Sequence, residues 1–512
     1  MAVHKMNLLS KFTANKSYTQ QLIDSCIRVI SIILAVTFII LMVMSLDWPL
    51  IWDVPIFHYI GWLMSIGKVP YKDIFDMNFP GTFLLHLFVI KVFGSGDLGW
   101  RLFDLLWLNM INVCVFYYLK PFGRLSAFVA AVTFSVFYLS SGPLHSGERD
   151  YFIILFMLMS IQCLASSFEK KCSLFKIALA GLILGGAIMI KPYVGAFYSM
   201  LLASIGIYAY RKGYAWITHV FVFVISGLFI PLAMCLWLGA QGGLRPFWDM
   251  MVNYLPIYSD LSRQPWQNIL LSYDLLYIPL VFEGFIVLVI SILFFIKQKT
   301  WNIRRGFLCL GVIYGLLHYL LQGRDWYYYL FPFLAFLIFL AASWLHDKDM
   351  QRHPVVHTIM LLMLLHLSIG YGIAGIKNII YPLDFRNFTG YFLANDLKNK
   401  IKPGDEIQII SHWGPSPHAM LLLQQPMVTR FVLTFHLFHN IQHPYIQKLR
   451  AEFLKTLQAR RPKIIAVYKT GWNENSSESI KKFPALADWL GKNYKMTIDK
   501  NYYQIFERLS SS

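Results

Sequence analysis

The sequence predicts a polytopic α-helical membrane protein with a small α/β domain at its C-terminal end. Of the 512 residues, 57% are apolar and only 14% are charged, whereas soluble domains carry about 25% charged residues. Apolar runs of roughly 17–25 residues, long enough to cross a bilayer, recur along most of the chain. After about residue 378 they give way to short strand-like runs that alternate with helical segments. These observations exclude a soluble globular protein.

The first predicted span, Val29 to Met44, consists almost entirely of Ile, Leu, Val and Met. It lacks the small-residue cleavage site of a secretory signal, so we expect it to remain in the protein as a span. The same criteria predict about 11 spans. They lie near residues 29–46, 100–119, 124–141, 151–168, 174–190, 193–210, 216–238, 270–296, 307–322, 327–345 and 355–376.

The net charge of +18 reflects membrane topology. Basic residues collect in alternate short segments between spans, as the positive-inside rule requires of cytoplasmic loops, and so predict no nucleic-acid partner. They place the N-terminus in the cytoplasm. With an odd number of spans, the C-terminal domain then lies on the opposite side of the membrane. The basic segments include Lys120 and Arg124, Arg211 and Lys212, and Arg304 and Arg305.

The apolar run Gly81 to Phe93 is too short for an easy span, at about 13 residues. It suits a helix that lies in the membrane interface or enters it partway. If this run crossed the membrane, the basic segments after it would change sides, against the charge rule. We therefore predict interfacial helices in the first outer loop.

The C-terminal domain is predicted to begin near residue 378, after a membrane module of residues 1–377. Helices near 391–401, 446–457 and 484–493 alternate with strands near 406–410, 464–468, 495–498 and 502–507, a pattern typical of a small α/β domain. It contains no Gly-rich phosphate loop. The six Cys residues lie in or beside apolar runs without CxxC spacing, so no disulfide framework or metal site is predicted.

The polar residues that are unusual for a membrane protein all fall on one side of this topology. Ionisable groups at a membrane boundary are costly unless they are paired, hydrated or used. Their convergence in several outer loops indicates a functional pocket. They are Asp53, Asp73, Asp76 and Asn78 in the first outer loop, Glu148, Arg149 and Asp150 in the second, Lys191 at the end of a span, and Arg324 and Tyr328 near another.

Each group also has a plainer interpretation. For Asp73 and Asp76, a role as hydrated carboxylates of a loop explains the sequence equally well. Glu148 to Asp150 could be a local ion pair that caps the fourth span, because acids favour a helix N-terminus. The aromatic run around Tyr328 could be an interfacial belt, and Lys191 could extend its ammonium to the interface.

Together, the acids and cations fit sugar transfer from a lipid-linked phosphosugar. A carboxylate must remove the proton of the acceptor hydroxyl as its oxygen attacks the anomeric carbon. A fixed Lys or Arg must stabilise the charge that grows on the departing phosphate. Holding both substrates in line supplies much of the remaining rate.

The order of these motifs resembles bacterial GT-C fold glycosyltransferases, similar to the protein O-mannosyltransferases and the lipid A aminoarabinose transferases. Trp52-Asp53, a following interfacial helix and then Gly67, Pro70, Tyr71 and Asp73 resemble the family's first outer loop. Later matches are Glu148-Arg149-Asp150 at a second acidic motif, Ile190-Lys191-Pro192 at a phosphate-contacting lysine, and Gln322 to Pro332 at a Tyr-rich span entry.

The resemblance implies a role for each candidate residue. Asp53 takes the position of the catalytic base, and Asp150 orients the acceptor or supports Asp53. Val54 follows Asp53 where many relatives have a second acid, so the base is left open between Asp53 and Asp73. The full set is Asp53, Asp150 and Glu148 as catalytic groups; Lys191, Arg324 and Arg149 at the donor phosphate; and Asp73, Asp76, Asn78 and Tyr328 at the acceptor or sugar.

The resemblance also implies a place in a bacterial inner membrane, with the C-terminal domain in the periplasm, and it implies the substrates. The donor would be a polyprenyl-phosphate monosaccharide and the acceptor an envelope glycan, lipid or protein, with inversion at the anomeric centre. No cofactor is assigned, and a divalent metal is left open. The alternative is a transporter or flippase of lipid-linked glycans. Transporters often show internal repeats and charges near the bilayer midplane, whereas this chain shows no obvious repeat and its charges lie at one interface.

Overall fold

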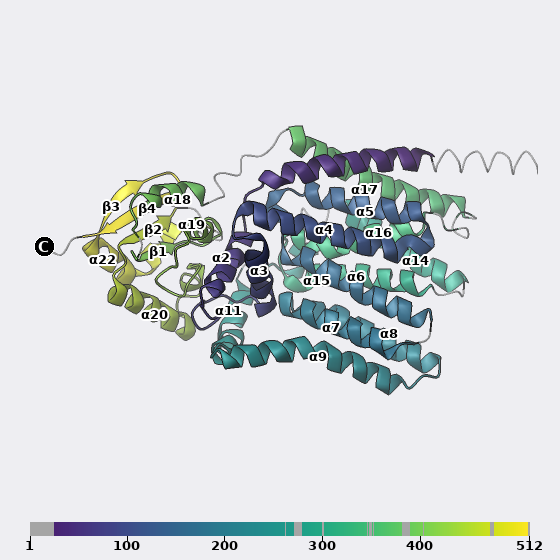
Figure 1. The fold of residues 1–512 in the computed structure, drawn as a ribbon, viewed down its shortest axis with the longest axis horizontal. Helices are drawn as coiled ribbons and strands as arrows, with labels where there is room; N and C mark the ends of the chain where they lie inside the picture. The colour runs from purple at the N-terminus through teal and green to yellow at the C-terminus, as the bar shows by residue number, and fades with distance from the viewer. Residues whose placement is uncertain are drawn as a thin grey trace, which may run out of the picture.

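The computed structural model describes residues 25–170, 172–261, 263–270, 279–298, 302–345, 347, 351, 353–380, 390–402, 404–469, 471 and 476–509. Long helices form a bundle, and one end of that bundle meets an α/β domain that contains the C-terminal strands (Figure 1). The first described helix and α17 lie together on one side of the bundle, and α9 lies on the other.

Each predicted span coincides with a helix of the bundle, although residues 271–278 of one span lie outside the described residues. Among the described residues, six helices are long and apolar enough to cross a membrane, so the chain is a multi-pass membrane protein. The helices that coincide with predicted spans, these six among them, are Ser25–Asp47, α4 (Asp97–Leu119), α5 (Arg124–Ser140), α6 (Arg149–Phe168), α7 (Leu174–Ile190), α8 (Val194–Arg211), α9 (Trp216–Ala240), α14 (Pro279–Gln298), α15 (Ile303–Gln322), α16 (Phe331–Ser343) and α17 (Pro354–Ile380).

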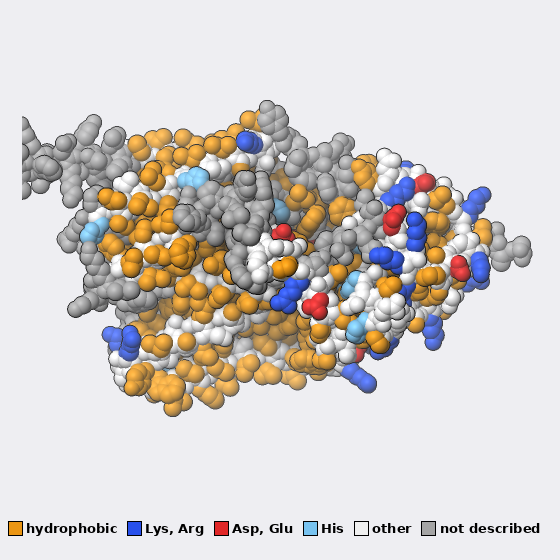
Figure 2. Space-filling model, turned by 180° about the vertical axis from the view of Figure 1, so that it is seen from behind, with side chains coloured by type: hydrophobic (Ala, Val, Ile, Leu, Met, Phe, Trp, Pro, Cys, Tyr) orange, Lys and Arg blue, Asp and Glu red, His pale blue; other side chains and the backbone are white. Residues whose placement is uncertain are grey.

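The outer surface of the bundle is apolar. Large hydrophobic side chains such as Ile32 and Leu236 are 61% and 75% exposed, which is unfavourable in water but natural against lipid tails. Figure 2 shows hydrophobic side chains over most of the bundle and a concentration of charged side chains on the α/β domain. The two parts therefore face different surroundings.

Two shorter helices lie across the end of the bundle. α2 (Val54–Ser65) and α3 (Pro80–Phe93) pack against each other, between the long helices and the α/β domain (Figure 1). This is the arrangement expected of the interfacial helices predicted for the first outer loop. The short helices α10 (Leu244–Asp249), α11 (Leu255–Asp260) and α12 (Trp266–Leu270) follow α9.

The α/β domain contains a four-stranded sheet of order β1-β2-β4-β3. β1 (Ile407–Ile410) is parallel to β2 (Ile464–Tyr468), and β4 (Tyr503–Arg508) is antiparallel to both β2 and β3 (Tyr494–Asp499). All four strands were predicted. Among its helices, α18 (Tyr391–Lys398) stops three residues before the predicted end, and α19 (Pro415–Leu423), α20 (Pro444–Arg460) and α22 (Pro484–Asn493) follow.

Hydrogen bonds to main-chain groups hold the α/β domain against the first outer loop and α2. The Phe75 amide donates to the Arg430 carbonyl at 2.7 Å, and the Arg430 guanidinium donates to the Tyr71 carbonyl at 3.1 Å. On α2, the Tyr59 hydroxyl donates to the Gln425 carbonyl and accepts from the Met427 amide. Hydrogen bonds to backbone groups fix the relative position of two segments closely. The α/β domain therefore helps to shape a site that includes residues of the first outer loop.

Candidate active site

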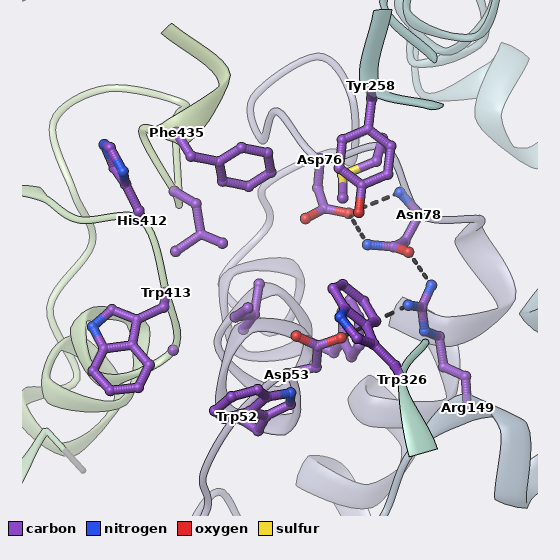
Figure 3. Close-up of a pocket in the computed structure, with 15 residues that line it drawn as sticks. Trp52, Asp53, Asp76, Asn78, Arg149, Tyr258, Trp326, His412, Trp413 and Phe435 are labelled. Carbon is purple, nitrogen blue, oxygen red and sulfur yellow. Dashed lines mark hydrogen bonds and ion pairs between the residues drawn. The ribbon is translucent and has the colours of Figure 1, made fainter. Parts of the chain in front are cut away.

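A pocket lies where the end of the bundle meets the α/β domain, with about 670 Å³ of empty space. Figure 3 shows its labelled side chains converging from both parts of the chain. Three predicted residues of the first outer loop and one predicted cation line it, beside aromatic residues. Trp52 and Trp326 belong to motifs identified in the sequence, whereas Tyr258, Trp413 and Phe435 do not. The labelled residues are Trp52, Asp53, Asp76, Asn78, Arg149, Tyr258, Trp326, His412, Trp413 and Phe435.

Asp53 sits at the N-cap position of α2, with its side chain 25% exposed. Its carboxylate lies 3.8 Å from Nη2 of Arg149. Burial raises the pKa of Asp53, while the charges of Arg149 and Lys191 lower it. The preceding Trp52 has φ 63°, a left-handed conformation that costs a bulky residue about 1–2 kcal/mol and persists only where the surroundings impose it.

Arg149 connects Asp53 to a second carboxylate. It donates from Nη1 to the Asn78 side-chain oxygen, and Asn78 donates from its amide and its side chain to one oxygen of Asp76 at 2.8 and 2.7 Å. Burial raises the pKa of Asp76 to about 6, against the effect of the bonds from Asn78. Asp53, Asp76, Asn78 and Arg149 thus form one polar side of the pocket.

Asp150 and Lys191 form a buried ion pair next to this polar side. Nζ of Lys191 donates to Oδ2 of Asp150 at 3.0 Å and lies 4.6 Å from the centre of the Tyr329 ring. The other oxygen of Asp150 lies 2.5 Å from Nε2 of His318 and accepts from Gln322 at 3.3 Å. Burial lowers the pKa of Lys191 to about 8, although Asp150 opposes this shift.

Glu148 is a buried carboxyl group. Its side chain is 1% exposed, and neither oxygen has a hydrogen-bond partner among the described residues. Burial and the charge of Asp53 raise its pKa well above the usual range. Glu148 lies at the N-cap position of α6, where its side chain makes no capping hydrogen bond. Asp150 lies in the first turn of the same helix and pairs with Lys191.

The remaining predicted residues take different positions. Arg324 donates to the Tyr258 hydroxyl at 2.8 Å and to the Leu261 carbonyl at 2.8 Å, so it holds the segment around α11. Tyr328 is buried, and no hydrogen bond of its hydroxyl is found within the described part of the chain. Asp73 does not line the pocket, because its carboxylate accepts from the Val69 amide at 2.9 Å and closes a local turn.

A second buried charge pair supports the loop that carries Glu148. Arg101 donates to Asp104 at 2.8 Å, and the Tyr138 hydroxyl donates to the same carboxylate at 2.5 Å. That hydroxyl accepts from the Gly147 amide at 2.8 Å. Gly147 has φ 75°, and a Cβ there would lie 2.7 Å from the Trp100 ring. The network fixes the backbone just before Glu148.

The structure places these groups within an architecture of known type, the GT-C fold: a membrane helical bundle, helices across one end and an adjoining soluble domain. Among solved structures, ArnT from Cupriavidus metallidurans is similar in its apo state, with a TM-score of 0.60 and 11% identity over 94% of this chain and 98% of that one. The same protein bound to undecaprenyl phosphate gives a TM-score of 0.60 and 12% identity, with the same coverage of the two chains.

An archaeal protein has the same fold with a lower TM-score. The oligosaccharyltransferase AglB from Archaeoglobus fulgidus, in complex with an inhibitory peptide and a dolichol-phosphate, gives a TM-score of 0.51 and 11% identity over 94% of this chain and 74% of that one. No sequence-family model matches the chain, and no curated protein matches it. At these identities the likeness shows the fold, which confirms the architecture expected from the motifs.

Proposed function

We propose that this protein is an inner-membrane glycosyltransferase that moves one monosaccharide from a polyprenyl-phosphate carrier to an envelope glycan, lipid or protein on the periplasmic face. The observation that carries the proposal is the placement of Asp53 within 3.8 Å of Arg149, beside the buried pair of Lys191 and Asp150. Two of the structures with this fold hold a polyprenyl phosphate, undecaprenyl phosphate in one and dolichol phosphate in the other.

Asp53 is the proposed base. Its carboxylate accepts the proton of the acceptor hydroxyl while that oxygen forms a bond to the anomeric carbon and the bond from that carbon to the phosphate oxygen breaks. The incoming oxygen approaches opposite the phosphate, so the configuration inverts. Asp53 is favoured over Asp73 because it lines the pocket, whereas the Asp73 carboxylate is used in a local turn.

The cations hold the departing phosphate. Arg149 lies next to the base, so the same guanidinium orients Asp53 and faces the donor. Lys191 begins paired with Asp150, and the donor phosphate shares its ammonium. Asp150 keeps His318 and Gln322 as partners throughout. Positive charge fixed in advance near the leaving group stabilises the transition state without reorganisation of the site.

The experiment compares the envelope glycans of a strain that lacks the protein with those of the same strain carrying wild-type, Asp53→Asn or Asp73→Asn protein. Wild-type and Asp73→Asn proteins should restore one monosaccharide mass to a glycan, lipid or protein. Asp53→Asn should restore none while reaching the membrane in equal amount. If Asp53→Asn restores the full mass, Asp53 is not the base; if no envelope component changes mass, the protein is not a glycosyltransferase.

A further inference from the structure

Three tryptophans from separate segments lie around the same pocket as Asp53. Trp52 precedes α2, Trp326 lies between α15 and α16, and Trp413 follows β1 in the α/β domain. All three are partly exposed and line the pocket. The rings of Trp52 and Trp413 meet edge to face with centres 6.3 Å apart, and Figure 3 shows Trp52 and Trp326 beside Asp53.

The side of the pocket that belongs to the α/β domain has a distinct chemistry. Its lining residues are His412, Trp413, Gly414, Leu433 and Phe435. Among the described lining residues, this wall contributes no Lys, Arg, Asp or Glu. All the acids, together with Arg149, come from the membrane module. The pocket is therefore charged where the donor phosphate would lie and aromatic on the opposite side.

The aromatic wall is built tightly against the loop that carries the base. Gly414 lies so close to the backbone of Trp52 that a Cβ at this position would be 2.0 Å from the Trp52 carbonyl oxygen. This contact holds Trp413 beside Trp52 and fixes the aromatic wall relative to Asp53. A ligand resting on the wall is thereby placed at a set distance from the carboxylate.

We propose, on the basis of the proposed function, that this aromatic wall is the acceptor subsite and that the acceptor presents a sugar ring to it. The C–H groups on the face of a sugar ring carry partial positive charge, and they pack against the negative faces of aromatic rings. The hydroxyls at the ring edge are hydrogen-bond donors that suit Asp53 and Asp76. One of those hydroxyls is the nucleophile.

The other acceptor classes fit this wall less well. A phosphorylated lipid head group requires cations, and the described wall of the α/β domain contributes no Lys or Arg to the pocket. A peptide in extended form pairs its backbone with the edge of a sheet, whereas the lining residues follow β1 and none belongs to a strand. The isoprenoid tail of the donor belongs at the lipid-facing bundle, away from Trp413.

The test uses the full-length protein and substrates from the deletion strain. Heavy-isotope polyprenyl-phosphate sugars are extracted from one culture. Three acceptor fractions come from an unlabelled culture: oligosaccharides freed of lipid and peptide, tryptic peptides, and glycan-free lipids. Transfer of the heavy sugar is detected by mass, and undecaprenyl phosphate binding is measured separately. The variants are Trp413→Ala, Trp413→Phe and, as a control outside the pocket on α18, Phe392→Ala.

The oligosaccharides should accept the sugar. Trp413→Ala should raise their KM roughly tenfold, the effect of one lost aromatic contact, and leave undecaprenyl phosphate binding unchanged. Trp413→Phe should recover most of the loss, and Phe392→Ala should match wild type. Transfer only to peptides or only to glycan-free lipids would overturn the sugar-ring assignment. An unchanged KM in the Trp413→Ala protein would overturn it as well. Both results would leave the proposed function standing. No transfer to any fraction by the wild type overturns both.

Discussion

The ammonium of Lys191 lies 3.0 Å from the carboxylate of Asp150, which also contacts His318 at 2.5 Å. Asp150 offsets part of the cost of burying the lysine, because an unpaired charge in a buried site is strongly unfavourable. The pair also keeps a positive charge in place beside Arg149 and Asp53.

Lys191→Ala should weaken undecaprenyl phosphate binding about 10- to 100-fold, the effect of losing one hydrogen bond to a charged group. Binding to the purified protein in nanodiscs measures this directly. Lys68→Ala is the control, because Lys68 is an exposed lysine just beyond the end of α2, whereas Lys191 is buried against Asp150. Equal affinities of the Lys191→Ala and Lys68→Ala proteins would remove Lys191 from the phosphate site.

The rate of transfer should depend on pH with two limbs. The base must be ionised, so activity falls as the pH drops through the raised pKa of Asp53. Lys191 must be protonated, so activity also falls as the pH rises through about 8. Lys191→Arg should move the alkaline limb beyond about pH 9, because a guanidinium stays charged there. If the alkaline limb of the Lys191→Arg protein stays near pH 8, a group other than Lys191 causes it.

Tyr138→Phe should destabilise the protein by about 1–3 kcal/mol, because it leaves the buried Gly147 amide without its partner and removes one of the hydrogen bonds to the Asp104 carboxylate. The loop before Glu148 should loosen, so kcat should fall more than the affinity for undecaprenyl phosphate. Thermal unfolding together with kinetics measures both effects. Tyr117→Phe is the control, since Tyr117 is an exposed residue of the neighbouring α4. Unchanged kcat in Tyr138→Phe would show that the network does not position the loop.

Gly414→Ala should separate the α/β domain from the first outer loop, because the new Cβ would overlap the Trp52 carbonyl oxygen. Transfer should fall at least tenfold, while helical content and membrane insertion persist. Gly491→Ala adds the same methyl group in α22, where a Cβ meets nothing within 4 Å. If the two alanine variants transfer equally well, the contact at Gly414 has no part in shaping the site.

The sequence allowed the membrane helices and the sheet strands to be predicted, and four of the expected site residues line one pocket. Hydropathy locates a span such as Val29 to Met44 because lipid contact requires a continuous apolar surface. Topology then brings Asp53, Arg149 and Lys191 to one face without any knowledge of packing. These are properties of single segments and of their order along the chain.

Partners set by long-range packing were not predicted. His318 lies among apolar and aromatic residues of α15, and its contact with Asp150 depends on how that helix packs against α6. The aromatic residues from Trp413 to Phe435 reach the pocket only because the α/β domain docks on the first outer loop. The local turn that Asp73 closes could have been predicted from the sequence, because Val69 and Asp73 are only four residues apart.

The most direct measurement is the rate at which purified Asp53→Asn protein transfers the sugar from the polyprenyl-phosphate donor to the acceptor. The amide fills the same space but cannot take a proton, so transfer should fall about 10²- to 10⁴-fold, with undecaprenyl phosphate binding and thermal stability close to those of the wild type. Transfer at the wild-type rate would contradict the assignment of Asp53 as the base and, with it, the mechanism built around this pocket.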